Sequence, residues 1–345
     1  MAELILAPYL SIPGQVTIGH WRLVPVRHVQ DLEELAPTPL RPSAERLIDA
    51  YSYENLGAVV HLDGEQIGPG YVPDGMQPLA HALLVGALAA NPNIAGETTD
   101  ANAGWAMQTV ENATLIVHPL GEPGGYAVEI GTLRRVTKIS GAEEGKPLPK
   151  VTPPRELPEP MFGSFDGELA AAALGCLSGK DLAARQLDRA LDWYRIAFAN
   201  SEAITADVRV GVARSALETM TGAGDSTQQL VRSYGRLVDE EDAPRTTYGA
   251  EQVWWAKGPT PLTEEEWWMT RLCGLRNAIV HGDQISEELW KHEGHHQVNQ
   301  IHDRLLVALR AFLAVSAGDR LLRLSSQERI FPRARQRAEA QKGTN

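Results

Sequence analysis

The sequence predicts an α+β protein with two parts, a β-rich N-terminal domain followed by an all-α helical domain. Short runs rich in β-branched and aromatic residues, separated by turns that contain Gly and Pro, are confined to residues 1–140. Apolar residues at helical spacing recur through residues 163–325. Residues 141–162 contain six prolines, which cannot continue a helix or a central strand, so we predict a linker there. Residues 326–345 are expected to form a polar, basic tail.

The composition is typical of a soluble globular protein, because 43% of the residues are hydrophobic and 22% are charged. No run of 18 or more apolar residues occurs, so we expect no membrane span and a cytoplasmic location. Both cysteines, Cys176 and Cys273, are interpreted as small core residues in a reducing compartment. The net charge of −12 argues against a general nucleic-acid binder, but not against an enzyme with a small basic groove.

The clearest prediction for the N-terminal part is a β-hairpin. Residues 114–118 and 126–131 are rich in β-branched residues, and the Gly-Glu-Pro-Gly-Gly segment at 121–125 is a turn signal. The second arm is expected to continue to Ile139. Further strands are predicted within residues 1–27 and at 58–62, and helices at 43–51 and 77–91.

In the C-terminal part, one helix is predicted to begin after Thr263 and to end at Gly282. Thr263 can cap the first turn, and the three glutamates that follow it suit the positive end of the helix dipole. Apolar residues continue at helical spacing to Ile279. Further helices are predicted at 168–177, 180–200, 208–220, 230–237 and 298–312.

The end of that helix, residues 275–282 (Leu-Arg-Asn-Ala-Ile-Val-His-Gly, here called the octet), carries the strongest chemical signal. Arg276 offers a fork of donors that fits phosphate oxygens. His281 is of the residue type that gives and takes a proton near neutral pH. This pairing indicates a site for a phosphodiester. The structural alternative is that both residues merely suit the negative end of a helix dipole.

The octet resembles the R-x4-6-H signature of the HEPN superfamily (higher eukaryotes and prokaryotes nucleotide-binding domain). It is similar in particular to the Apea-like branch, in which an Arg-Asn pair leads to an Ile/Val-Val-His-Gly ending. An earlier helix of that branch ends in an Ala-Leu-Glu-type motif, and Val210–Glu218 fits its place. The resemblance covers roughly residues 165–325. It implies a helical bundle that forms a homodimer, with two Arg/His sets in one cleft.

Many domains of this family are metal-independent endoribonucleases without a cofactor, so the resemblance implies an RNA substrate. His281 would be the general acid or base, Arg276 would stabilise the transition state, and Asn277 would orient the imidazole or contact phosphate. Glu218 would orient Arg276. Other members only dimerise or bind partners, which remains the alternative. By analogy with phage-defence and toxin-like systems, residues 1–140 would sense a phage or regulatory protein.

A competing motif lies in residues 292–296, His-Glu-Gly-His-His, which match the H-E-x-x-H zinc helix. In that reading His292 and His296 would bind Zn²⁺ and Glu293 would be the base of a metallohydrolase. The polar surroundings favour instead a solvated loop in which His292, His295 and His296 contact RNA. The tryptophan pairs at 254–255 and 267–268 invite base stacking, but core or interface anchoring is the preferred interpretation.

Overall fold

The chain divides into two units, and each is described by itself. The first comprises Met1–Asn91 with Gly104–Ser178, and the second Pro92–Ala103 with Gly179–Asn345. The sequence instead places the boundary in the linker at 141–162, which lies outside the described residues. The structure, a computed structural model, describes residues 4–7, 12, 14–26, 29–35, 41, 56–61, 76–89, 114–119, 126–132, 135–139, 165–197, 204–224, 226–239, 242–292 and 295–318.

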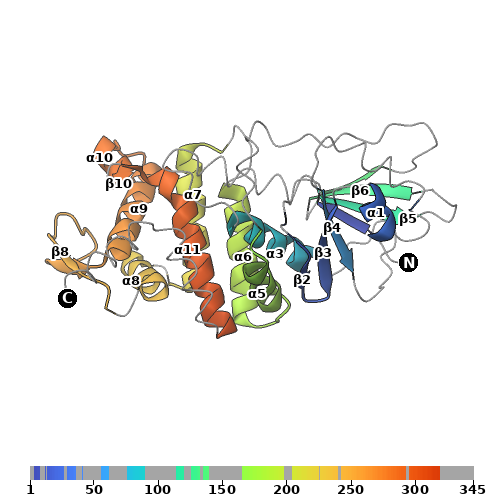
Figure 1. Cartoon of the computed structure of the whole chain (residues 1–345). Coiled ribbons are helices and arrows are strands. Elements are labelled where there is room, and N and C mark those ends of the chain that lie inside the picture. Colours follow the sequence, from blue (N-terminus) through green and yellow to red (C-terminus); the bar gives the residue numbers. More distant parts are fainter. Residues whose placement is uncertain are drawn as a thin grey trace, which may run out of the picture. The chain divides into compact units, whose positions relative to one another are not determined.

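The first unit contains a seven-stranded antiparallel sheet in the order β2-β3-β4-β1-β5-β6-β7 (Figure 1). The predicted hairpin is confirmed, because β5 pairs with β6 in a register that places Leu115 opposite Ile130. Its second arm does not continue to Ile139 as expected, since it ends at Thr132 and Arg135–Ile139 form a separate strand that pairs back on it. The strands are β1 (Leu4–Ala7), β2 (Val16–Ile18), β3 (Trp21–Val26), β4 (Leu56–His61), β5 (Thr114–Pro119), β6 (Tyr126–Thr132) and β7 (Arg135–Ile139).

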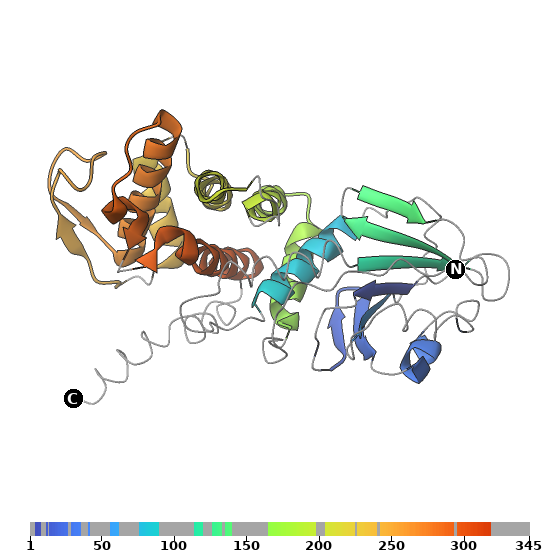
Figure 2. The same ribbon diagram turned by 90° about the horizontal axis from the view of Figure 1, so that it is seen from above.

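The helices of this unit are α1 (Val29–Leu35), α3 (Met76–Ala89) and α5 (Gly167–Leu177), and α3 packs directly on α5 (Figure 2). At their contact, a Cβ on Gly86 would lie 2.4 Å from the ring of Phe165, so only glycine fits there. The helix predicted at 168–177 is therefore confirmed, but it packs with the first unit. The helix predicted at 43–51 lies outside the described residues.

The second unit is a helical bundle in which α7 contacts α6, α9 and α11, and α8 contacts α9 and α11 (Figure 1). All five long helices match predicted ones. Within the described residues, no helix combines the length and the apolar character needed to cross a membrane. The helices are α6 (Leu182–Ala197), α7 (Ala206–Thr221), α8 (Thr227–Val238), α9 (Glu264–His281), α10 (Glu287–Trp290) and α11 (Gln297–Ala317).

The expectation of an all-helical domain needs correction, because two short antiparallel ribbons interrupt the bundle. One pairs β8 (Thr246–Tyr248) with β9 (Thr260–Leu262), and the other pairs β10 (Lys291–His292) with β11 (His295–His296). Each strand has only two or three residues, which is too short for a period-two pattern to be visible in the sequence.

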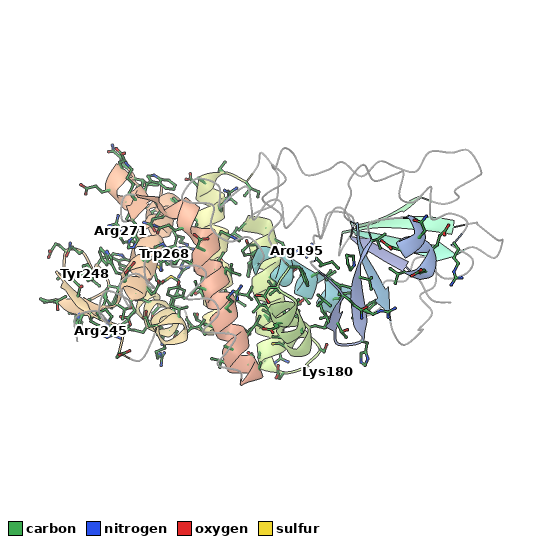
Figure 3. The ribbon with its side chains drawn as sticks, viewed as in Figure 1. Lys180, Arg195, Arg245, Tyr248, Trp268 and Arg271 are labelled. Carbon is green, nitrogen blue, oxygen red and sulfur yellow. The ribbon has the colours of Figure 1, made fainter. Side chains whose placement is uncertain are left out.

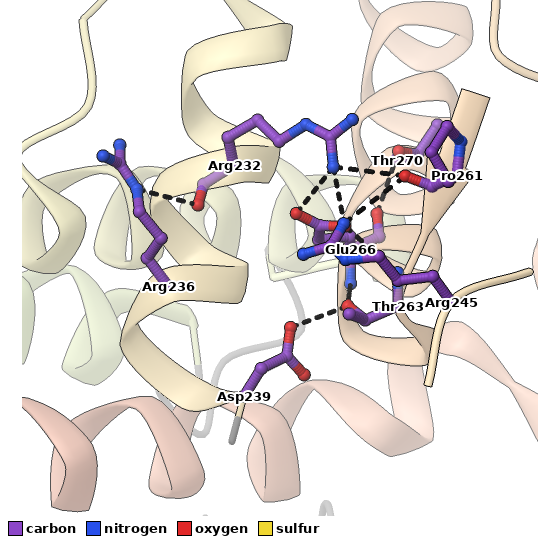
Figure 4. Close-up of polar contacts among 8 residues, drawn as sticks. All are labelled: Arg232, Arg236, Asp239, Arg245, Pro261, Thr263, Glu266 and Thr270. Atoms are coloured by element: carbon purple, nitrogen blue, oxygen red, sulfur yellow. Dashed lines mark hydrogen bonds and ion pairs between the residues drawn. The ribbon is translucent and has the colours of Figure 1, made fainter. Parts of the chain in front are cut away.

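A buried carboxylate, Glu266, fixes the start of α9 (Figure 4). It is 2% exposed and completes a capping box, in which its side chain accepts from the backbone N–H of Thr263 while the Thr263 hydroxyl accepts from its own N–H. Nη1 of Arg232, on α8, lies 2.8 and 2.9 Å from the two carboxylate oxygens, and Nη1 of Arg245 lies 2.8 Å from one of them. A buried carboxylate held in this way joins the helix start to α8 and to the β8–β9 ribbon.

The same junction holds a second acid, Asp239, whose carboxylate accepts a 2.6 Å hydrogen bond from the Thr263 hydroxyl. Burial raises the pKa of Asp239 to about 6, against the opposing effect of that hydrogen bond. Close packing across the junction is possible because residue 235 of α8 is glycine. A Cβ there would lie 2.5 Å from Cγ of Glu266.

Across the bundle, α6 and α11 are linked by a buried polar pair. The hydroxyl of Tyr194 lies 2.5 Å from Nδ1 of His302. His302 is 3% exposed, and burial lowers its pKa to about 4. The imidazole is therefore neutral at pH 7, which avoids an unpaired charge inside the bundle.

We predict that replacing Gly235 with alanine destabilises the protein by about 1–3 kcal/mol, because the new methyl group collides with the fixed side chain of Glu266. Urea unfolding measures the effect. Gly211→Ala on α7 is the matched control, since a Cβ there meets nothing within 4 Å. Alanine at an open helical position is neutral or stabilises by up to about 1 kcal/mol. Equal responses of the two variants would contradict this packing.

We also predict that His302 makes the fold sensitive to acid. Its folded pKa is depressed below its ordinary value, so its stabilising contribution is complete above about pH 6.5 and is lost as the pH falls towards 4. Between pH 7.5 and 5 the free energy of unfolding of the wild type should fall by about 2 kcal/mol more than that of His302→Asn, which cannot titrate. Urea titrations at the two pH values measure this difference, and parallel changes in both proteins would refute the role.

Candidate functional site

The octet forms the C-terminal end of α9, as predicted. The helix ends at Gly282, which adopts a left-handed conformation with φ 72°. The Asp283 N–H donates to the carbonyl of Ala278 at 2.9 Å, and the Gly282 N–H reaches the carbonyl of Ile279. These two bonds are a Schellman motif, which satisfies the last helical carbonyls. His281 is therefore the last helical residue and is exposed to solvent.

Arg276 lies on the side of α9 that faces α7. Its Nη1 donates to Oδ1 of Asn277 at 3.3 Å, and its guanidinium is close enough to Cys273 to influence that thiol. Burial raises the pKa of Cys273, the charges of Arg214 and Arg276 oppose this change, and the charge of Glu218 adds to it. The structure thus brings Arg276 and Glu218 to the surroundings of one buried thiol.

Glu218 forms an ion pair with Arg214, one turn earlier on α7, in which Oε2 of Glu218 lies 3.5 Å from Nη1 of Arg214. The structure shows no hydrogen bond or ion pair between Glu218 and Arg276. In place of the expected orienting contact, the charges of Glu218 and Arg276 both act on the pKa of the Cys273 thiol. Sequence reasoning missed Arg214 and Cys273 because their relation to Arg276 depends on how α7 packs on α9.

One chain does not bring Arg276 and His281 together. In an α-helix five residues turn through about 140° beyond a full turn, so these two side chains leave α9 in different directions. Asn277 lies about 40° from His281 around the axis, which confirms that these two share a face. Within the described residues, the His281 imidazole makes no hydrogen bond or ion pair. A phosphate held by both side chains would need the second set of a partner chain.

The face of α9 that presents His281 also carries Trp267, Arg271 and Gly274. Trp267, Arg271, Gly274 and His281 are spaced by four, three and seven residues in turn, so all four lie within about 40° of one line along the helix. Near the start of this line the surface is hollowed, with a volume of about 420 Å³. This hollow, called the Trp267 hollow, is lined by Tyr248, Glu264, Trp267, Arg271, Glu288, Lys291 and His292.

The wall of the hollow is aromatic and partly cationic, and two of its residues, Tyr248 and Arg271, are labelled in Figure 3. The ring of Tyr248, on the β8–β9 ribbon, stacks on Trp267 with centroids 4.1 Å apart and planes 14° apart. The guanidinium of Arg271 lies 5.6 Å from the Trp267 centroid. Nη2 of Arg271 donates to the carbonyls of Lys291, at 2.7 Å, and of Glu288, which ties β10 to α9.

The histidine cluster differs from both interpretations of its sequence. Lys291–His292 and His295–His296 are paired strands, so the helical spacing that the zinc motif requires is not formed. His292 is 4% exposed, which corrects the expectation of a solvated loop residue, and burial together with the charge of Arg271 lowers its pKa to about 4. Within the part of the chain that the structure describes, no three His, Cys, Asp or Glu side chains are placed to hold a metal ion.

The tryptophans of the two pairs differ in their exposure to solvent. Trp268 is fully buried, as expected of a core anchor, whereas Trp254 is 50% exposed. Trp267 is half-buried at the surface hollow. The four-residue spacing of Trp267 and Arg271 on a predicted helix was the available signal for this hollow, but Tyr248 and Lys291 reach it from separate segments.

Comparison of the chain with protein-family models, with curated proteins and with solved structures finds no match. A proposal about function must therefore depend on the residues of α9 and their surroundings.

We predict that Gly282→Ala lowers the free energy of unfolding by about 1–2 kcal/mol, because an L-residue with a Cβ is strained at φ 72°. The surrounding space is open, so the loss reflects the backbone alone. Gly282→Asn should lose less, since asparagine tolerates the left-handed conformation. Urea unfolding ranks the three proteins, and an asparagine variant as unstable as the alanine variant would contradict this assignment of the helix end.

Proposed function

We propose that the chain is a metal-independent endoribonuclease of the HEPN type, active as a homodimer, and that it works in a defence or toxin-like system. The observation that carries the proposal is the octet at the open end of α9. It leaves the His281 imidazole in solvent and holds the Arg276 guanidinium, half-buried, through Asn277. An exposed imidazole and a positioned guanidinium are the two groups that cleavage of a phosphodiester by an internal hydroxyl requires.

In the proposed reaction His281 takes the proton of a ribose 2′-hydroxyl while the 2′-oxygen bonds to the adjacent phosphorus. The bond from phosphorus to the 5′-oxygen of the next nucleotide breaks, and that oxygen takes up a proton from water, while the protonated His281 returns its proton to the solvent. The products are a 2′,3′-cyclic phosphate and a 5′-hydroxyl end. Arg276 stabilises the negative charge that builds on the phosphate oxygens.

The helix geometry supports a site made by two chains. Because about 140° separates Arg276 and His281 around α9, the imidazole of one chain would act beside the guanidinium of its partner. Val280, which is 58% exposed beside His281, offers an apolar surface for such a pairing. In this proposal residues 1–140 restrain or trigger the site by binding a phage or regulatory protein.

The test is cleavage of a labelled single-stranded RNA in the presence of EDTA. The wild type should cut it, and Arg276→Ala and His281→Ala should each slow cleavage at least about 100-fold. An RNA with deoxyribose at the cut position should remain intact, because the attacking hydroxyl is missing.

Two matched controls remove the same side chains elsewhere. Arg236→Ala takes an exposed arginine from α8 whose hydrogen bonds stay within that helix, and His20→Ala takes an exposed histidine from the first unit. Both should cleave at the wild-type rate. Equal cleavage by all five proteins would refute the proposal, and RNA binding without cleavage would favour a non-catalytic binding domain.

A further inference from the structure

We propose that the Trp267 hollow binds one guanine base of the RNA substrate and thereby selects where the chain is cut. The inference rests on the proposed function, which it extends from a reaction to a base preference. It concerns a surface separate from the octet, formed by α9, the β8–β9 ribbon and the α10–β10 segment.

The hollow lies on the same helix, α9, as the octet. Arg271 in the hollow and His281 at the helix end share one face, and ten residues of helix place them about 15 Å apart along the axis. Gly274 lies between them on the same line, where a Cβ would be 3.5 Å from Nε1 of Trp254 and 3.7 Å from Cδ1 of Leu289. A single strand of RNA held at the hollow would therefore pass over the side chains of Trp254 and Leu289 on its way to His281.

The aromatic wall is the second argument. Tyr248 and Trp267 already form a parallel stack at the surface, and both rings line the hollow. A base added to such a stack gains favourable contact whatever its sequence, which is how single-stranded nucleic acids are commonly held. The volume of about 420 Å³ is that of a small-ligand site, sufficient for a nucleoside and too small for a duplex.

The polar lining selects the base. Arg271 and Lys291 carry donors and Glu264 and Glu288 carry acceptors, so the formal charges of these four groups cancel. Lys291 is already paired with Glu287, and Oε1 of Glu264 lies 3.8 Å from Nη2 of Arg304, which leaves the Glu288 carboxylate and the part of the Arg271 guanidinium not bound to backbone carbonyls to meet a ligand. Such a lining fits a neutral ring with both kinds of edge better than it fits a phosphate. Guanine presents the acceptors O6 and N7, which arginine recognises, and an amino group that carboxylates accept. Adenine has no carbonyl to take up the second donor.

Two buried polar atoms of the hollow residues lack a hydrogen-bond partner within the described residues, namely Nε of Arg271 and Nε2 of His292. Buried polar groups are normally paired, so orphaned ones indicate groups that a ligand or water satisfies. His292 lines the hollow and is 4% exposed, and the charge of Arg271 acts on its ring. The ring is therefore part of the floor of the hollow and not a mobile surface group.

The experiment measures binding separately from cleavage. The probe is a fluorescein-labelled 2′-O-methyl oligouridine, which cannot be cut, with one central guanosine, one central adenosine or neither. Fluorescence anisotropy with the full-length protein should show about tenfold tighter binding of the guanosine oligomer. Tyr248→Leu, which removes the stacked ring, should abolish that preference, whereas Tyr248→Phe, which keeps the ring, should retain it.

Glu288→Gln is the second variant, because this exposed residue at the rim can lose its charge without disturbing the core. It should reduce the preference for guanosine while leaving the thermal midpoint unchanged. Equal binding of all three oligomers by the wild type, or an unchanged preference in both Tyr248→Leu and Glu288→Gln, would overturn the inference. Loss of preference in these variants, together with no RNA cleavage by the wild type, would keep the base site and reject the endoribonuclease.

Discussion

The carboxylate of Glu266 is the contact on which the packing around the start of α9 depends. It closes the first turn of α9, accepts from arginines on α8 and at the base of the β8–β9 ribbon, and packs where Gly235 leaves room. Removing this buried carboxylate would leave the backbone N–H of Thr263 without its acceptor, together with two arginine side chains that are 32% and 47% exposed. The position of the ribbon, and with it Tyr248, therefore follows from one side chain in the first turn of α9.

From this fixed start, the 3.6-residue period of the helix places the polar side chains of α9 on different sides of its axis. On one side, the charge of Arg276 acts on the Cys273 thiol, as do the charges of Arg214 and Glu218 on α7, which form an ion pair with each other. Another side carries the hollow and His281 along a common line. Because the two sides are separate, the proposed site at the octet calls for a second chain, and the proposed base site lies beside it without sharing its residues.

Features that depend on neighbouring residues were readable from the sequence. Thr263 with Glu266 predicted the start of α9, Gly282 predicted its end, and the apolar spacing predicted every long helix of the bundle. Features that depend on distant segments were not. The burial of His292 depends on Arg271 binding the carbonyls of the α10–β10 segment, and the stack on Trp267 depends on a three-residue strand. Secondary-structure propensity reflects neighbouring residues only, so it does not predict such contacts.

The two ends of α9 differ in how tightly they are held. The first turn is anchored by the buried Glu266 and its arginine partners, whereas the octet ends in an exposed turn closed by backbone hydrogen bonds. Residues that hold the fold together and residues that are open to solvent are thus separated along a single helix. Substitutions of the exposed side chains of Val280 and His281 are therefore expected to disturb folding little, so the chemistry at this helix end can change while the bundle stays intact.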